Sequence, residues 1–145
     1  MKNGMLTFVC AVGLTGCMTM TKPVALKDAR PVPAERIFMH QSPPAGDHAA
    51  VVVTRDRGLV GGACALSLLS AGKDAAHLRP GETVTLWLPA GEQLLGVGHV
   101  QQGICGSNAE RMRREFEVSI RPGEDRRYRM ATDSGGGLFL TPVSI

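Results

Sequence analysis

Aromatic residues are scarce in this chain of 145 residues: one Trp, one Tyr and four Phe make up 4% of the sequence. No charge of one sign dominates, since 16 Lys and Arg stand against 13 Asp and Glu, for a formal net charge of +3. A domain that binds nucleic acid through a basic surface and aromatic stacking has the opposite composition, so nucleic acid is not an expected partner. The length fits one domain.

Common catalytic and metal-binding motifs are also missing. There is no Gly-x-Ser-x-Gly nucleophile motif, no His-Glu-x-x-His pair and no Walker phosphate-binding loop. Of the four histidines, His40 and His48 lie in a proline-rich stretch, and His77 and His99 lie near the ends of expected strands. Catalysis requires positioned groups. We therefore expect no enzyme activity, no catalytic residue, no metal and no cofactor.

The one long apolar run lies at the start of the chain. It covers Met5 to Leu14, follows Lys2, and has the pattern of an export signal. A bilayer span needs about 20 residues, so the run is too short to cross a membrane. It ends at Leu14-Thr15-Gly16-Cys17, which resembles the lipobox of bacterial lipoproteins. The resemblance implies a signal peptide over residues 1–16, a diacylglycerol on Cys17, and an acyl group such as palmitate on its new amino group.

The residue after Cys17 bears on localisation. In the lipoproteins that the motif resembles, Asp at this place favours the inner membrane, whereas this chain has Met18. The resemblance therefore implies an outer-membrane lipoprotein facing the periplasm, with the inner membrane as the alternative. A second alternative is that Cys17 only follows an ordinary cleavable signal or an N-terminal helix.

Residues 17–49 are expected to be the lipidated Cys and a flexible tether. Between Met18 and Ala49 the chain has five prolines and no sustained apolar period. About 30 flexible residues would have an end-to-end distance of ~30 Å, enough for the domain to stand off the membrane. Within this stretch, Ile37-Phe38-Met39 is a candidate edge segment.

Residues 50–145 are expected to form an all-β domain, a small antiparallel β-sandwich of about 7–8 strands. Short runs of β-branched and aliphatic residues alternate with Gly and Pro, which is typical of strands and turns. Arg79-Pro80-Gly81-Glu82 and Arg121-Pro122-Gly123-Glu124 suit type II turns. One helical turn or a charged loop is expected from Ser107. The expected strands cover residues 50–54, 63–69, 75–78, 83–88, 93–97, 115–120, 126–131 and 138–143.

Two cysteines remain in the expected mature domain. Cys64 and Cys105 both lie beside glycines, and an oxidising compartment favours one disulfide between them. Free thiols, or a redox or metal role with His77 or His99, are the alternatives. Basic residues gather twice along the chain and could make one patch for an anionic partner if their strands adjoin. The alternative is a solvated surface balanced by nearby acids. The residues concerned are Arg111, Arg113, Arg114, Arg126, Arg127 and Arg129.

The pattern from Val51 to Ala131 resembles a group of uncharacterised small proteobacterial lipoproteins with PEGA-like β-sandwich domains. Three segments carry the resemblance: Ala71-Gly72-Lys73, Leu86 to Glu92, and Ile120 to Glu124 leading to Tyr128. The resemblance implies antiparallel strands and no particular activity.

We expect a non-enzymatic binding or scaffold module held to the membrane by its lipid. One alternative is an accessory subunit of an envelope secretion or transport assembly, with a protein partner at an exposed strand edge such as Ala50 to Thr54. Another is a small periplasmic enzyme, which predicts a pocket where His77 or His99 meets a carboxylate within hydrogen-bond reach, or an inhibitor that uses the loop from Gln101 to Asn108. The sequence does not fix an oligomeric state.

Overall fold

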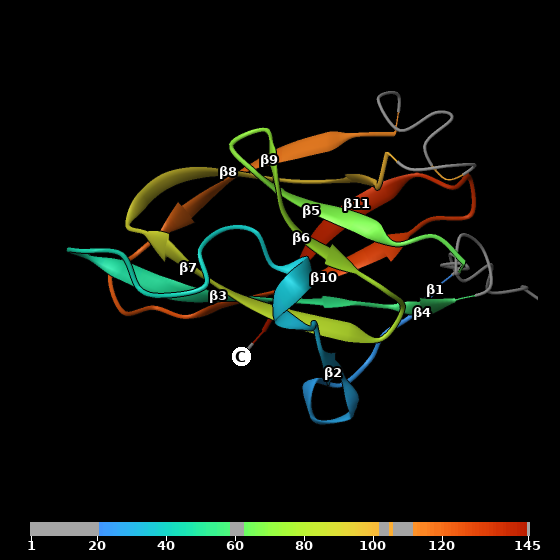
Figure 1. Ribbon diagram of the computed structural model, residues 1–145, viewed down its shortest axis with the longest axis horizontal. Helices are drawn as coiled ribbons and strands as arrows, with labels where there is room; N and C mark the ends of the chain where they lie inside the picture. The colour runs from blue at the N-terminus through green and yellow to red at the C-terminus, as the bar shows by residue number, and fades with distance from the viewer. Residues whose placement is uncertain (1–20, 59–62, 102–104, 106–111, 145) are drawn as a thin grey trace, which may run out of the picture.

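The computed structural model describes residues 21–58, 63–101, 105 and 112–144. Within them the regular structure is β-strand with two short 3-10 turns, η1 (Leu26–Asp28) and η2 (Ala34–Arg36). The expected all-β sandwich is confirmed: a five-stranded and a four-stranded sheet pack face to face (Figure 1). The signal peptide of residues 1–16 and the lipidation residue Cys17 lie outside the described residues.

The five-stranded sheet has the order β11-β10-β3-β7-β2. Its pairs are antiparallel except β10 with β3 and β2 with β7, which run parallel. Pro31 and Pro142 lie in the edge strands β2 and β11, where a missing N–H donor disrupts least, and Pro89 is the last residue of the central strand β7. The strands are β2 (Arg30–Pro31), β3 (His48–Arg55), β7 (Glu82–Pro89), β10 (Arg126–Thr132) and β11 (Leu138–Val143).

The four-stranded sheet has the order β6-β5-β8-β9 and is antiparallel throughout. A third, two-stranded sheet pairs β1 (Thr21–Lys22) with β4 (Arg57–Gly58). All eight strands expected from the sequence are present, with ends that differ by up to three residues; the strand expected over 63–69 begins only at Leu66. The four-stranded sheet consists of β5 (Leu66–Ser70), β6 (Lys73–Leu78), β8 (Gly91–His99) and β9 (Arg114–Ile120).

Alternation along each strand builds one core between the sheets. In β9, Val118 and Ile120 are buried and Phe116 packs against the core, whereas Glu115 and Glu117 are exposed, as the alternation predicts. Facing strands contribute fully buried aliphatic side chains, among them Val51, Leu68, Leu86 and Leu95. The hydrophobic effect therefore fixes the register of both sheets.

The Pro-Gly turns have the expected conformation. Gly81 and Gly123 have φ of 77° and 70°, and the N–H groups of Glu82 and Glu124 donate to the carbonyls of Arg79 and Arg121. Positive φ at the third position is what a type II turn requires, and Gly adopts it without strain. Most of the stretch from Ser107, expected as a helical turn or charged loop, lies outside the described residues.

The segment before residue 50 differs from the expected flexible tether. From Thr21 onward it packs on the sandwich: β1 pairs with β4, β2 pairs with β7, and Val32 is buried in the core. The candidate edge segment is confirmed, since Ile37 and Met39 pack against the core and Ile37 bridges Ala76. The prolines of this segment suit edge and turn positions, so they do not prevent it from packing. Its isolated apolar residues Val32, Ile37 and Met39 provide the contacts with the core.

Candidate functional site

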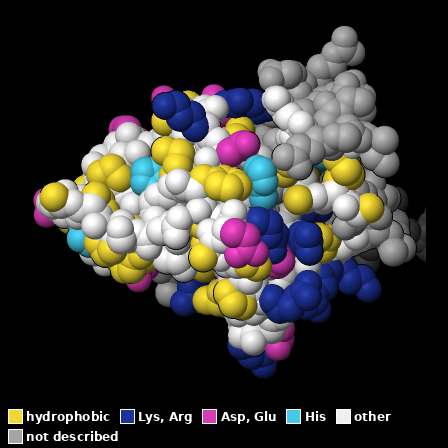
Figure 2. Space-filling view, in the orientation of Figure 1, with side chains coloured by type: hydrophobic (Ala, Val, Ile, Leu, Met, Phe, Trp, Pro, Cys, Tyr) yellow, Lys and Arg dark blue, Asp and Glu magenta, His cyan; other side chains and the backbone are white. Residues whose placement is uncertain are grey.

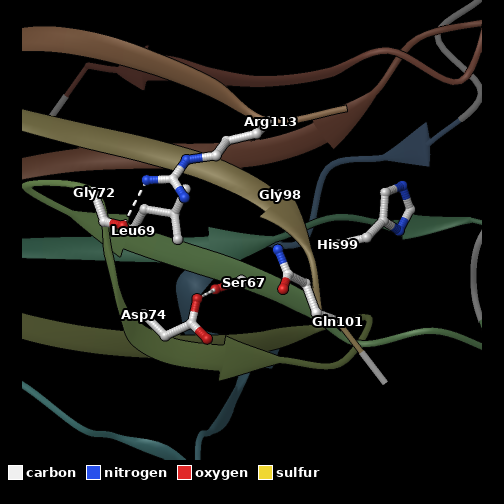
Figure 3. Close-up of a pocket in the computed structure, with 8 residues that line it drawn as sticks. All are labelled: Ser67, Leu69, Gly72, Asp74, Gly98, His99, Gln101 and Arg113. Carbon is white, nitrogen blue, oxygen red and sulfur yellow. Dashed lines mark hydrogen bonds between the residues drawn. The ribbon is translucent and has the colours of Figure 1, made fainter. Parts of the chain in front are cut away.

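The outer face of the four-stranded sheet carries a hollow of about 220 Å³ (Figure 3). Side chains alternate across a strand, and most of the residues that line the hollow, such as Ser67 and Gly98, face away from the core, whereas the neighbouring His99 pairs with the core residue Leu66. Gly98 leaves space there, because a Cβ at this position would lie 3.9 Å from its nearest neighbour. The lining residues are Ser67, Leu69, Gly72, Asp74, Gly98, His99, Gln101 and Arg113.

Charges of both signs border this hollow. The Arg113 guanidinium reaches over the sheet and donates to the Gly72 carbonyl at 2.5 Å (Figure 3). It also donates to the Glu115 carboxylate at 2.9 Å. Asp74 lies on the other side and accepts a hydrogen bond from the Ser67 hydroxyl. A polar group of amino-acid size fits such a space, which is smaller than an ordinary drug-sized pocket.

An acid and a histidine meet beside the hollow. His77 Nε2 lies 3.3 Å from Asp74 Oδ2, and the other oxygen of Asp74 binds Ser67. In nucleophilic catalysis the hydroxyl donates to an imidazole, which takes its proton. Here the hydroxyl donates to the carboxylate and the imidazole lies on the far oxygen. The order Ser–Asp–His therefore suits a hydrogen-bonded binding surface better than an activated nucleophile.

His99 ends β8 on the inner side of this region. Burial lowers its pKa, and the charge of Arg55 lowers it further. Its Nδ1 atom is buried and finds no hydrogen-bond partner among the described residues. Neither His77 nor His99 belongs to a group of metal-ligating side chains in the described part of the chain.

Cys64 and Cys105 form a disulfide, with Cα atoms 5.7 Å apart. It joins the chain just before β5 to the chain between β8 and β9. The expected pairing is confirmed, and the free-thiol alternative does not hold in this structure. Of the loop from Gln101 to Asn108, only Gln101 and Cys105 are among the described residues.

The strands that carry the two clusters of the sequence-predicted arginine patch do not adjoin. β9 belongs to the four-stranded sheet and β10 to the five-stranded sheet, so consecutive strands carry the two clusters to different sheets. Arg113 binds Glu115, Arg126 lies 3.0 Å from Glu124, and Arg129 pairs with Asp56. Arg114 is exposed on β9 and Arg127 on β10, and Arg111 lies outside the described residues.

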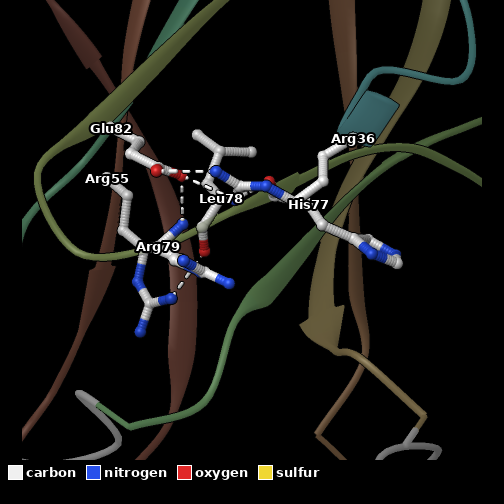
Figure 4. Close-up of polar contacts among 6 residues, drawn as sticks. All are labelled: Arg36, Arg55, His77, Leu78, Arg79 and Glu82. Carbon is white, nitrogen blue, oxygen red and sulfur yellow. Dashed lines mark hydrogen bonds and ion pairs between the residues drawn. The ribbon is translucent and has the colours of Figure 1, made fainter. Parts of the chain in front are cut away.

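A buried polar network that the sequence did not reveal ties the N-terminal segment to both sheets (Figure 4). Arg36 binds both carboxylate oxygens of Glu82, at 2.8 and 2.7 Å, and donates to the His77 carbonyl at 3.0 Å. Arg55, only 4% exposed, donates to the carbonyls of Leu78 and Cys64. Burial lowers the pKa of Arg55 to about 10, against the opposing charge of Glu82.

A second network holds the first described residue. The Thr21 hydroxyl donates to buried Asp56 at 3.3 Å and accepts from the Thr132 N–H at 3.3 Å. Arg129 Nε donates to the same carboxylate at 3.0 Å. That hydrogen bond, partly offset by burial, raises the pKa of Arg129. Thr21 is therefore buried and held in the domain by hydrogen bonds.

A groove of about 410 Å³ lies on the outer face of the five-stranded sheet. Residues 23–26 form one wall, and Val52, Thr54, Arg127, Arg129 and Val143 line the rest with Tyr128. No helix in the described part of the chain is long and apolar enough to cross a membrane.

Comparison with known proteins gives no matching family model, and no curated protein sequence matches the chain significantly.

Proposed function

We propose that this protein is a lipid-anchored periplasmic protein of the outer membrane whose β-sandwich is a non-enzymatic binding or scaffold module. The observation that carries the proposal is Leu14-Thr15-Gly16-Cys17 at the end of a short apolar run. Two or three acyl chains on Cys17 anchor a protein stably without a transmembrane helix. The PEGA-like resemblance is part of the same proposal and implies the same β architecture.

The disulfide supports export. Disulfides persist in oxidising compartments such as the bacterial periplasm and are rare in the cytosol. Cys64 and Cys105 are paired in the structure, which fits a domain that folds after crossing the inner membrane.

The hollow on the four-stranded sheet supports binding over catalysis. It brings together the hydroxyl of Ser67 on β5, the carboxylate of Asp74 on β6 and the guanidinium of Arg113, the residue before β9, so a small polar ligand or a peptide side chain can be held by several hydrogen bonds. Ser67 lacks an imidazole acceptor, because its hydroxyl donates to Asp74. These contacts favour a rigid recognition surface.

The accessory-subunit alternative predicts an open strand for a partner. The sequence suggested Ala50 to Thr54 as that edge, but β3 is a central strand between β10 and β7. Its backbone N–H and C=O groups are therefore used within the sheet. A partner that added a strand would need one of the edge strands β2, β11, β6 or β9 instead.

Mass spectrometry of the protein purified from its native membrane without reductant tests the proposal. The expected N-terminal peptide begins at Cys17 and carries the mass of a diacylglycerol and an acyl chain. The expected peptide map also links Cys64 to Cys105. A Cys17→Ala variant should remain an unprocessed precursor, and a Cys10→Ala variant is the matched control that should be processed normally. An unmodified Cys17 in the native protein would refute the lipid anchor.

A further inference from the structure

Positive side chains gather where the described chain begins. Figure 2 shows Lys and Arg grouped over the part of the molecule where Figure 1 places β1, β4 and β2. We call this surface the N-terminal basic face. All of its cations are exposed, and they are Lys22, Lys27, Arg30, Arg57 and Arg79.

Backbone pairing brings these cations together from distant parts of the sequence. Lys22 lies directly opposite Arg57 in the β1–β4 pair. The Arg57 guanidinium lies over Gly81, where an added Cβ would come within 2.5 Å of Arg57 Nε. Arg30 donates its N–H to the Gly81 carbonyl at 3.0 Å. The turn at Gly81 is therefore the point around which the basic face is built.

The basic face has few acids of its own. The segments that form it, residues 21–31, 57–58 and 79–81, contain five cations and one acid, Asp28. The neighbouring carboxylates of Asp56 and Glu82 are buried and bind Arg129 and Arg36. Because those two acids are used inside the fold, they do not balance the surface cations.

The pairing places the cations Lys22 and Arg57 directly opposite each other, although Arg57 also donates to the Asp28 carbonyl. Like charges directly opposite each other on antiparallel strands repel and destabilise the pair. Together with Pro23, Val24, Ala25 and Asp28, these two residues line a shallow hollow of about 250 Å³. Two cations against the one carboxylate of Asp28 leave this place with a net positive charge, and an anion there would reduce the repulsion between Lys22 and Arg57.

The length of chain before Thr21 limits where this face can be. Cys17 precedes Thr21 by four residues, and four extended residues span at most ~14 Å. Since Thr21 is fixed in the fold by Asp56 and Thr132, a lipid on Cys17 holds the basic face next to the headgroups. At physiological ionic strength charges interact over about 8 Å, which is comparable with that span.

We propose that the N-terminal basic face docks on the anionic phospholipid headgroups of the membrane that holds the lipid anchor. The inference rests on the proposed function, since the anchor brings the face to the membrane. Docking fixes how the sandwich is oriented on the membrane, whereas a long tether would leave it free to rotate.

Vesicle binding tests the docking without the anchor. The chain from residue 17, with Cys17→Ser and the Cys64–Cys105 disulfide intact, is sedimented with vesicles of equimolar phosphatidylglycerol and phosphatidylcholine, and with vesicles of phosphatidylcholine alone. We expect binding to the anionic vesicles only. The triple variant Lys22→Gln, Lys27→Gln, Arg57→Gln should bind about 100-fold more weakly, at about fivefold for each charge removed.

The matched control removes the same charge elsewhere. Lys73, Arg114 and Arg121 are exposed and belong to the four-stranded sheet or the turn after it. Replacing all three with Gln gives the same net charge as the first triple variant and should leave vesicle binding close to that of the parent chain. Arg57→Lys keeps the charge and should also bind normally. Thermal unfolding of each variant checks that it folds.

The outcomes separate this inference from the anchor. Equal losses in the two triple variants, or equal binding to neutral vesicles, would refute the basic face as the docking surface. So would full competition by millimolar inorganic phosphate, which would indicate a site for a free anion. None of these results depends on Cys17, whose modification is decided by mass spectrometry of the native protein.

Discussion

At the scale of single residues, buried charges decide how the N-terminal segment is held. Glu82 starts β7 and is 6% exposed, yet it receives hydrogen bonds from Arg36 and from the Arg79 N–H. Burial alone would raise the pKa of Glu82. The hydrogen bonds and charges of Arg36 and Arg79 outweigh burial and lower it below its ordinary value of 4.5.

This pKa has a consequence for stability against pH. A carboxyl with a lower pKa in the folded state contributes stability above its unfolded pKa, and that contribution is lost as the pH falls through the folded value. Glu82→Gln should therefore lower the free energy of unfolding at pH 7 by on the order of 3 kcal/mol, as for a broken buried ion pair. The difference from the parent chain should shrink below about pH 4.5. Urea unfolding at several pH values measures it, and a difference that stays constant down to pH 2 would contradict the prediction.

Sequence patterns could not reveal these residues. A buried ion pair such as Arg36–Glu82 joins positions that are 46 residues apart, and each looks like an ordinary surface charge in its own segment. Cys64 and Cys105 could be paired from the sequence because they are the only two cysteines after Cys17. A cysteine can form a disulfide only with another cysteine, whereas a charged side chain can pair with any of many oppositely charged residues in the chain.

At the scale of elements, the β5–β6 hairpin contains a residue in an unfavourable conformation. Its two turn residues, Ala71 and Gly72, have φ of 46° and 79°. This is the conformation of a type I′ turn, for which Asn-Gly is the preferred pair. Ala at the first position is strained because its Cβ disfavours positive φ.

Ala71→Asn should therefore raise the free energy of unfolding, by about 0.5–1 kcal/mol. Gly72→Ala should lower it, because its φ is positive and the new Cβ would lie 3.1 Å from Arg113. Thermal and urea unfolding of the two variants measure both changes. A lower free energy of unfolding in Ala71→Asn would show that backbone strain at residue 71 does not limit the stability of the domain.

The disulfide belongs to the same scale, since it fixes the chain between β8 and β9 to the start of β5. Its cysteines are 41 residues apart. In the chain-entropy model, removing such a crosslink costs about 4 kcal/mol. The double variant Cys64→Ala, Cys105→Ala should show this loss in guanidinium unfolding, and reductant should destabilise the parent chain but not the variant. Equal stability with and without reductant in the parent would contradict the entropic role.

Local sequence patterns predicted most of the strands but little of how the strands pair with one another. The eight expected strands were found because alternation and the Pro-Gly turns are local signals, as in β9 with the turn at Gly123. Strand pairing is not local. That β9 and β10 would enter different sheets, separating Arg114 from Arg127, follows from how the whole core is closed.

At the scale of the whole molecule, the N-terminal segment is part of the domain. Val32 fills the core, and Arg36 neutralises Glu82. A chain that begins at residue 48 should lose at least about 3 kcal/mol of stability, because a buried carboxylate loses its partner. A chain that begins at residue 21 is the control and should keep the stability of the mature protein. Equal unfolding curves for the two truncated chains would show that residues 21–47 act only as a tether.

The bonds of Thr21 also set when folding can finish. This first described residue is hydrogen-bonded to Thr132, 111 positions later, and β3 pairs in parallel with β10. Contacts between such distant parts of the sequence form slowly and need both partners present. A chain made from its N-terminus therefore cannot complete the five-stranded sheet until residue 132 is available for pairing. We expect the last step of folding to follow the synthesis of nearly the whole chain.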